Sequence, residues 1–251
     1  MNVRVALLPQ LAGDTSNAVC IVVDVLRATT VTSVLFDRNC PLIYVAASHN
    51  DARKFASDKN VLLCGETGGI KEPDFDYGNS PVEFSTLNFA DRPVVLSTTN
   101  GTKAVAHVSG ARKVLLGAAI NRMAVARAAC EVASDTDSDI VIVCSGTDEN
   151  FTLEDATVAG LYAEAIYGMA GGLSYGVPML DDAAIACRRL WQNEPNMLRG
   201  WMEGIHAQTL GDRGFGDDVG YCAGIDKLQN VPTLVNPNMV KSVPCPVVLV
   251  R

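Results

Sequence analysis

Hydrophobic and polar positions form two kinds of segment along the first 150 residues. Short runs rich in Val, Ile and Leu have the length and composition of buried strands. Segments with the helical spacing of apolar residues separate them. The predicted strands cover about 18–24, 42–46, 61–64, 93–97, 113–117 and 139–144, and the predicted helices about 28–37, 50–58, 101–109 and 121–134. This alternation is typical of an α/β protein, a three-layer α/β/α fold with a mainly parallel sheet.

The pattern becomes more helical after residue 150. Longer helices are predicted there, followed by a short pair of strands. The helices cover about 152–170, 180–192, 195–210 and 217–227, and the strands 233–235 and 239–243. The glycine-rich break at 170–176 is too short for a free linker between domains. We therefore expect a single unit over 1–251, with 1–150 and 151–251 as alternative sub-lobes.

The 251-residue chain has a formal net charge of −8 and contains no cluster of Lys and Arg, which argues against nucleic acid as a partner. Its apolar runs are far shorter than the roughly 20 residues that cross a bilayer. The N-terminus also lacks a secretory signal pattern. We expect a cytoplasmic protein that does not insert into membranes, and the apolar composition also fits a homodimer.

The eight cysteines do not form any C-x-x-C pair, and several lie in apolar runs. They are interpreted as reduced thiols of the core. The three histidines are too few and too scattered in sequence to indicate a zinc site.

The first candidate site follows the apolar run 18–24, which ends in Asp24 and continues to Arg27. Ligands of open α/β sheets bind at the carboxyl ends of the strands. A carboxylate beside a guanidinium at this edge indicates a metal ion and an anion held together. The competing interpretation is a helix cap with a nearby ion pair.

Polar residues follow the other predicted strands in the same way. Glu66 lies in a glycine-rich loop, and Glu154 and Asp155 begin a helix, where the helix dipole alone also favours acidic residues. Hard oxygen ligands of this kind suit Mg²⁺. The segment Asn100-Gly101-Thr102 begins a helix and is a candidate cradle for a phosphate or sulfonate.

Known phosphate-handling motifs are mostly absent from the sequence. There is no G-x-x-x-x-G-K-[ST] loop and no G-x-G-x-x-G after a strand. Asp24 ends a strand as an aspartyl-phosphate nucleophile does, but Leu26 stands where a second Asp acts as general acid in haloacid dehalogenase-like phosphatases. Attack by water is therefore preferred to a covalent intermediate.

Five strings together resemble the 2-phosphosulfolactate phosphatase family over about residues 20–230. They are 23–30 (VDVLRATT), 65–69 (GETGG), 75–81 (FDYGNSP), 98–102 (TTNGT) and 153–155 (LED) with Ala159-Gly160. The resemblance implies an α/β fold and Mg²⁺-dependent hydrolysis of 2-phospho-3-sulfolactate, a small anionic phosphate ester, in coenzyme M biosynthesis. Thr67 stands where the family usually has an arginine, and Asp74 where a glycine is common. The substrate could therefore be a similar phosphorylated hydroxy acid. Alternatively, Arg92, Arg122 or Arg213 replaces the missing arginine.

The expected site assigns catalytic roles to Asp24, Arg27, Glu66 and Asp155, and metal binding to Asp24, Glu66, Glu154 and Asp155. Substrate binding is assigned to Thr29, Gly68, Asn79, Thr99, Asn100, Gly101 and Thr102. The alternative to substrate binding for Asn79 is a structural role in a turn before a short helix that starts near Val82. His206, Asp217 and Asp218 are expected to be structural or solvated, with an acid role as the alternative. An aspartyl-phosphate phosphatase and a non-catalytic binder of phosphorylated metabolites remain as other functions.

Overall fold

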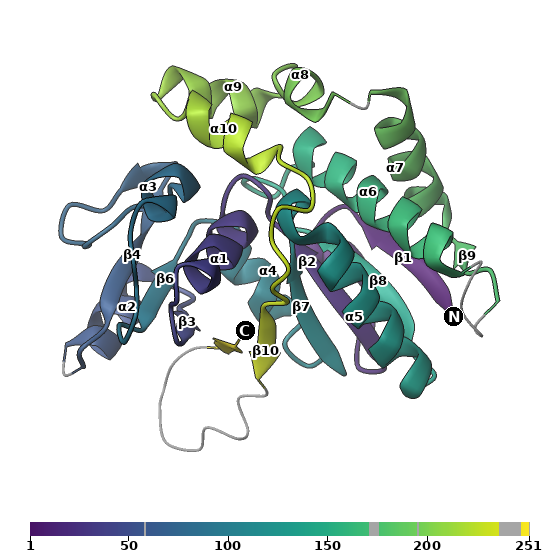
Figure 1. The fold of residues 1–251 in the computed structure, drawn as a ribbon, viewed down its shortest axis with the longest axis horizontal. Coiled ribbons are helices and arrows are strands. Elements are labelled where there is room, and N and C mark those ends of the chain that lie inside the picture. Colours follow the sequence, from purple (N-terminus) through teal and green to yellow (C-terminus); the bar gives the residue numbers. More distant parts are fainter. Residues whose placement is uncertain (58, 171–175, 195, 236–246, 251) are drawn as a thin grey trace.

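A computed structural model describes residues 1–57, 59–170, 176–194, 196–235 and 247–250. One sheet of eleven strands runs through the molecule (Figure 1). The strands are β1 (Asn2–Ala6), β2 (Ala18–Val23), β3 (Ile43–Val45), β4 (Leu62–Thr67), β5 (Ile70–Lys71), β6 (Val94–Ser97), β7 (Lys113–Gly117), β8 (Asp139–Cys144), β9 (Met179–Leu180), β10 (Thr233–Val235) and β11 (Val247–Val250). Their order is β5-β4-β6-β3-β11-β10-β7-β2-β8-β1-β9.

Parallel pairing dominates two parts of this sheet. Strands β4, β6 and β3 form one parallel set, and β7, β2, β8, β1 and β9 form the other. The antiparallel pair β10 and β11 lies between the two sets and is antiparallel to both of its neighbours, β7 and β3. The predicted mainly parallel sheet is confirmed, and strands from both halves of the chain share it.

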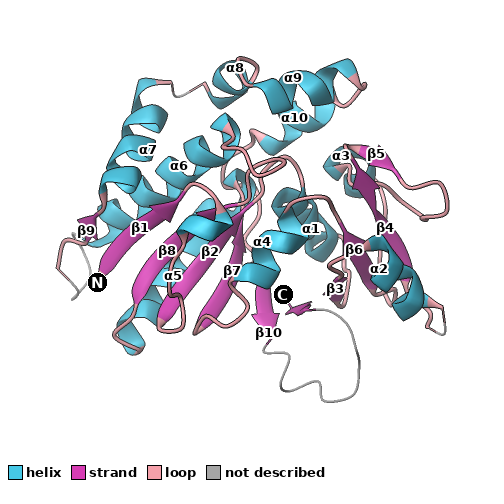
Figure 2. Cartoon of the chain, turned by 180° about the vertical axis from the view of Figure 1, so that it is seen from behind, coloured by secondary structure: helices cyan, strands magenta, loops and turns pink. Residues whose placement is uncertain are grey.

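Helices cover both faces of the sheet, so the predicted three-layer α/β/α fold is confirmed. Figure 1 shows α5 and α6 in front of β2 and β8, and Figure 2 shows α4 on the opposite face. The α-helices are α1 (Ala28–Asp37), α2 (His49–Ala56), α3 (Pro81–Ser85), α4 (Gly101–His107), α5 (Arg122–Asp135), α6 (Leu153–Ala170), α7 (Asp182–Asn193), α8 (Met197–Trp201), α9 (Ile205–Asp212) and α10 (Gly216–Cys222). Short 3₁₀ turns lie at Pro9–Leu11 and Ala119–Asn121.

Alternating side chains of β2 enter different hydrophobic clusters, which explains why the strand is apolar throughout. Ile21 and Val23 pack in the cluster under α5, α6 and α7, whereas Cys20 and Val22 pack in the cluster with α1 and α4. Every residue of β2 is buried. A strand buried on both faces has no solvent-facing position for a polar residue. The first charged residue, Asp24, therefore comes where the chain leaves the sheet.

Several predicted elements differ from the structure. The predicted helix 195–210 is divided into α8 and α9, the predicted helix 217–227 is the shorter α10, and strand β1 was missed. The predicted strand 239–243 and the centre of the predicted break at 170–176 lie outside the described residues. The single unit over 1–251 stays a prediction.

Seven cysteines are free and buried, as predicted for core thiols, and Cys245 lies outside the described residues. Among the helices that the structure describes, none combines the length and the apolar composition needed to span a bilayer.

Candidate active site

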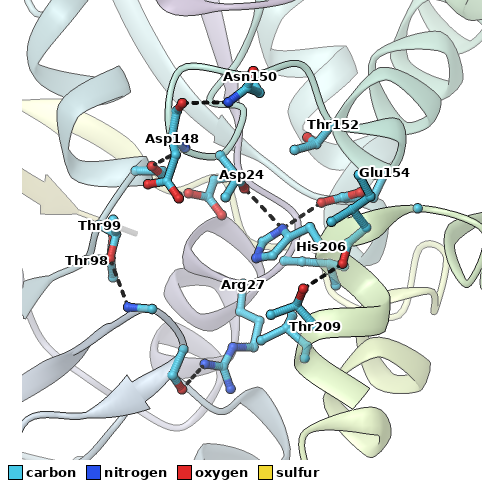
Figure 3. Close-up of a pocket in the computed structure, with 18 of the residues that line it drawn as sticks. Asp24, Arg27, Thr98, Thr99, Asp148, Asn150, Thr152, Glu154, His206 and Thr209 are labelled. Carbon is cyan, nitrogen blue, oxygen red and sulfur yellow. Dashed lines mark hydrogen bonds and ion pairs between the residues drawn. The ribbon is translucent and has the colours of Figure 1, made fainter. Parts of the chain in front are cut away.

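A cavity of about 830 Å³ lies where β2 and β8 of one parallel set and β4 and β6 of the other leave the sheet. Its walls are the segments after β2, β4, β6 and β8, and α9 covers it from the helical C-terminal half (Figure 3). The predicted site residues that line it are Asp24, Arg27, Glu66, Gly68, Asn79, Thr99, Asn100 and Glu154. The strand ends therefore converge on one cavity, as expected from the sequence.

Asp24 is the first residue after β2, and its carboxyl group is bound at the start of α1. Its Oδ1 accepts a hydrogen bond from the Ala28 N–H at 3.2 Å. The residue is only 6% exposed. The pKa of Asp24 is raised to about 6, mainly by burial and to a smaller extent by the charge of Glu66, while the charge of His206 opposes the rise. Asp24 is thus a buried carboxylate that is ionised near neutral pH at a cost to stability.

Arg27 is held rigidly by groups from distant parts of the chain. Its Nη1 donates to Asp218 at 2.6 Å and its Nη2 donates to the Gly69 carbonyl at 2.8 Å. The guanidinium also lies over the Phe215 ring, 4.3 Å from its centroid. Asp218 is buried and additionally accepts from the Ser80 hydroxyl at 2.7 Å. The expectation that Asp218 is structural is refined: it is the counter-ion of Arg27, whereas Asp217 is exposed.

Glu66 connects the glycine loop after β4 to the segment after β6. One carboxylate oxygen accepts from the Thr99 N–H at 3.0 Å, and the other accepts from the Gly69 N–H. Gly68 and Gly69 have φ of +57° and +89°, which glycine adopts without strain. Both Glu66 oxygens are therefore occupied by backbone donors, and the carboxylate fixes the loop that faces the cavity.

Glu154 and His206 form a hydrogen-bonded pair at the cavity wall (Figure 3). The Glu154 Oε1 lies 2.7 Å from His206 Nδ1, and the Thr147 hydroxyl lies 3.2 Å from the same nitrogen. Burial alone would lower the pKa of His206, but its hydrogen bond to Glu154 and the charges of Glu154, Asp24 and Asp155 outweigh this, so the pKa is raised. His206 therefore tends to be protonated, with Nδ1 directed at Glu154.

Four predicted site residues stand behind the cavity wall and do not line it. Asp155 accepts from the Val25 N–H at 3.0 Å, the Ser145 hydroxyl at 3.0 Å and the Gly146 N–H at 3.1 Å. Burial, and then the charges of Asp24 and Glu154, raise its pKa. The side chains of Thr29 and Thr102 donate to the carbonyls of Asp24 and Thr98, both at 2.9 Å.

The predicted cradle at 100–102 is only partly present at the cavity. Asn100 lines it, but Gly101 backs onto Asp24: a Cβ at Gly101 would lie 2.6 Å from the Asp24 Oδ2. Gly101 and Thr102 thus belong to the support of Asp24 and Thr98, since close packing there leaves no room for a ligand.

Among the described residues, no group of three or more His, Cys, Asp or Glu side chains is arranged to hold a metal ion. Four buried oxygens at the cavity nevertheless have no hydrogen-bond partner within the described structure: Asn79 Oδ1, Thr98 Oγ1, Thr152 Oγ1 and Glu154 Oε2. An all-oxygen donor set is what Mg²⁺ prefers, and this ion typically needs only one or two carboxylates from the protein. The donors that remain unsaturated fit such an ion. Glu66 and Asp155 accept hydrogen bonds from backbone N–H groups, and their assignment to the metal stays a prediction.

Of the three arginines considered as substitutes at the Thr67 position, only Arg213 lines the cavity. Arg122 is paired with Asp226, and Arg92 is exposed elsewhere. His206 and Arg213 both come from the α9 region, far along the chain from the strand ends, so their spacing in the sequence does not place them at the cavity. For His206, the one sequence signal was its position as a polar residue at the end of a predicted helix.

Comparison with known proteins agrees with this geometry. A family model described as 2-phosphosulpholactate phosphatase matches residues 6–237. A protein of Deinococcus radiodurans named probable 2-phosphosulfolactate phosphatase is 39% identical over 242 residues, which cover 94% of this chain and 94% of that protein. Proteins with the same name from Thermus thermophilus and Clostridium novyi are 38% and 30% identical, over 86% and 90% of this chain and 87% and 92% of their own. The chain therefore belongs to the 2-phosphosulfolactate phosphatase family, a family of phosphoric monoester hydrolases, as its motifs predicted.

Proposed function

We propose that the protein hydrolyses 2-phospho-3-sulfolactate to 3-sulfolactate and inorganic phosphate, with Mg²⁺ as cofactor. The names of the relatives support the substrate. The observation that carries the proposal is the meeting of Asp24, Arg27, Glu154 and His206 in one cavity, although they come from both halves of the chain (Figure 3). The proposed reaction would be a step of coenzyme M biosynthesis. The cytoplasmic location and the homodimer stay predictions.

Asp24 and Glu154 are the residues that would hold Mg²⁺, with Asn79 and Thr98 as neutral oxygen donors nearby. Bound there, the ion would neutralise charge on the phosphoryl oxygens. The support for this assignment is the donor set: buried oxygens with no partner, next to a carboxylate whose pKa is raised by burial. A cation is the group that such oxygens need.

Arg27 and His206 supply N–H donors to the reaction, and each is held by a carboxylate, that of Asp218 and that of Glu154. Arg27 is fixed by Asp218 and Gly69, so its guanidinium is already oriented when a phosphate ester enters. Protonated His206 directs Nδ1 at Glu154 and keeps Nε2 for the cavity, from which it can donate a proton to the leaving alkoxide oxygen. Water is the nucleophile in this proposal, because the apolar Leu26 stands at the position of a second acid.

The test measures phosphate release from 2-phosphosulfolactate, 2-phospholactate and phosphoglycerate, with Mg²⁺ and with EDTA. Asp24→Asn is expected to lose at least about 100-fold in kcat, and Asp217→Asn, the same change at an exposed carboxylate, is expected to retain wild-type activity. A wild-type protein that releases no phosphate, or releases it equally well in EDTA, contradicts the proposal. Rapid quench during a single turnover distinguishes the two mechanisms, since phosphate covalently attached to Asp24 requires an aspartyl intermediate, whereas direct attack by water leaves Asp24 unmodified.

A further inference from the structure

Arg213 is a cavity residue that the proposed reaction does not use. It directly follows α9 and lies against the glycine loop. A Cβ at Gly68 would lie 3.3 Å from the Arg213 Nη1, and a Cβ at Gly69 would lie 3.6 Å from it. Leu210, one turn earlier on α9, packs on the same loop, 3.2 Å from the Gly69 Cβ position. The Arg213 guanidinium therefore rests on loop backbone that only glycines leave uncovered.

The charge of Arg213 has no counter-ion among the described residues, in contrast to that of Arg27. Arg27 is neutralised by Asp218 at 2.6 Å, whereas neither an ion pair nor a side-chain hydrogen bond joins Arg213 to the described parts of the chain. Both guanidiniums lie within 4 Å of the Gly69 Cβ position, at 3.6 and 3.8 Å. One side of the glycine loop thus presents an unneutralised cation to the cavity.

The neighbouring side chains are already bound to each other and leave this end of the cavity to Arg213. The Thr67 hydroxyl donates to Glu72 at 2.6 Å and lies 3.0 Å from His49 Nε2. The carboxylate of Glu66 is occupied by backbone N–H groups. Neither residue forms an ion pair or a hydrogen bond with the Arg213 guanidinium in the described structure.

The cavity therefore presents groups of opposite charge to different parts of a ligand. Asp24 and Glu154 present carboxylate oxygens, which repel a bare anion and accept a cation. Arg213 presents up to five N–H donors in a planar fork, which matches two oxygens of an oxyanion. A cavity of about 830 Å³ also exceeds what a phosphate group alone requires.

We propose that Arg213 binds the sulfonate of the substrate, rather than its phosphate or its carboxylate, and so determines substrate specificity. The inference rests on the proposed function, because it assigns a residue to one of the three anionic groups of that substrate. Arg213 takes no part in breaking the phosphate ester. Its contribution is the affinity for sulfonated over unsulfonated phosphate esters.

The test compares Arg213→Gln and Arg213→Lys with wild type on 2-phosphosulfolactate and on 2-phospholactate, which lacks the sulfonate. Arg213→Gln is expected to lower kcat/KM for the sulfonated substrate roughly 10- to 100-fold, mainly through KM, because one charge-assisted hydrogen-bonding group is lost. The value for 2-phospholactate stays within about two-fold. Arg213→Lys is expected to be intermediate, since an ammonium keeps the charge but not the fork. Arg199→Gln, at an exposed arginine outside the cavity, is the matched control.

Equal losses on both substrates would assign Arg213 to the phosphate or the carboxylate and overturn the inference, as would unchanged kinetics on both. Binding of the product 3-sulfolactate, against lactate, gives a readout that does not need catalysis. If 3-sulfolactate raises the Tm of wild type and Arg199→Gln but not of Arg213→Gln, Arg213 binds the sulfonate even where the wild-type protein releases no phosphate. An equal rise in all three proteins overturns the inference separately from the proposed function.

Discussion

Replacing Asp24 by Asn is expected to stabilise the metal-free protein at neutral pH while removing activity. Asn keeps an oxygen that can accept from the Ala28 N–H, so the start of α1 retains its hydrogen bond. What the substitution removes is a buried negative charge. The perturbation therefore isolates the free energy that the protein spends on keeping this carboxylate ionised.

The magnitude follows from the pKa of Asp24, which burial raises from 3.8 to about 6. One pKa unit corresponds to about 1.4 kcal/mol, so the ionised side chain costs about 3 kcal/mol. Between these two pKa values the folded protein binds more protons than the unfolded chain, and wild-type stability falls as the pH rises through this window. The cost is complete above about pH 6 and is absent well below pH 4.

Urea unfolding in EDTA at about pH 8 and pH 4 measures the effect. Asp24→Asn is expected to exceed wild type by about 3 kcal/mol at the higher pH and by less than about 1 kcal/mol at the lower pH. Asp217→Asn, at an exposed carboxylate, is expected to change stability by no more than about 0.5 kcal/mol at either pH. A variant that is no more stable than wild type at pH 8 would refute the reasoning. Adding Mg²⁺ should then stabilise wild type but not Asp24→Asn.

Three further variants test other parts of the site. Arg27→Met leaves Asp218 buried without its counter-ion and is expected to lower the free energy of unfolding in urea by about 3–5 kcal/mol. Arg199→Met, at an exposed ion pair, is the control and is expected to lower it by less than about 1 kcal/mol. A loss below about 1 kcal/mol for Arg27→Met would contradict the importance of the buried pair. Gly101→Ala places a Cβ 2.6 Å from the Asp24 Oδ2 and is expected to lower kcat by about 100-fold. Gly110→Ala, whose Cβ meets nothing within 4 Å, serves as its control, and an unchanged kcat in Gly101→Ala would show that Asp24 is not held from this side. His206→Gln is expected to lower kcat for 2-phosphosulfolactate by at least about 100-fold, with His107→Gln as the exposed control, and equal kcat values remove His206 from proton transfer.

The central strands were predictable from sequence because both of their faces are buried, which requires continuous apolar runs. Strand β1 was missed because Arg4 interrupts its pattern and Asn2 is exposed. The predicted helix 195–210 breaks between α8 and α9 at a point that local propensity does not define. A Cβ at Gly204 would lie 3.5 Å from Leu153 and 3.7 Å from Glu154. Packing against the start of α6 therefore determines where α9 begins, and it brings His206 to Glu154.

The location of the candidate site was predictable because the carboxyl ends of parallel strands share one edge. Residue type, however, does not show in which direction a side chain points. Thr29 and Thr102 were assigned to substrate from their position, but their hydroxyls bond to backbone carbonyls within the walls. The Asp155 carboxylate likewise does not line the cavity and accepts from the N–H groups of Val25 and Gly146. Arg213 could be named only as an alternative, since its place depends on the tertiary position of α9.

The antiparallel pair β10 and β11 joins the strand set that carries Glu66 to the set that carries Asp24. Both strands follow every candidate catalytic residue in the chain. On the ribosome the strands of both sets are synthesised before residues 247–250, so the last strand that joins the two sets is made after both of them. Truncations that remove this last strand are thus expected to yield chains that retain all the catalytic side chains yet fail to assemble them, and hydrolysis appears only when translation has passed it.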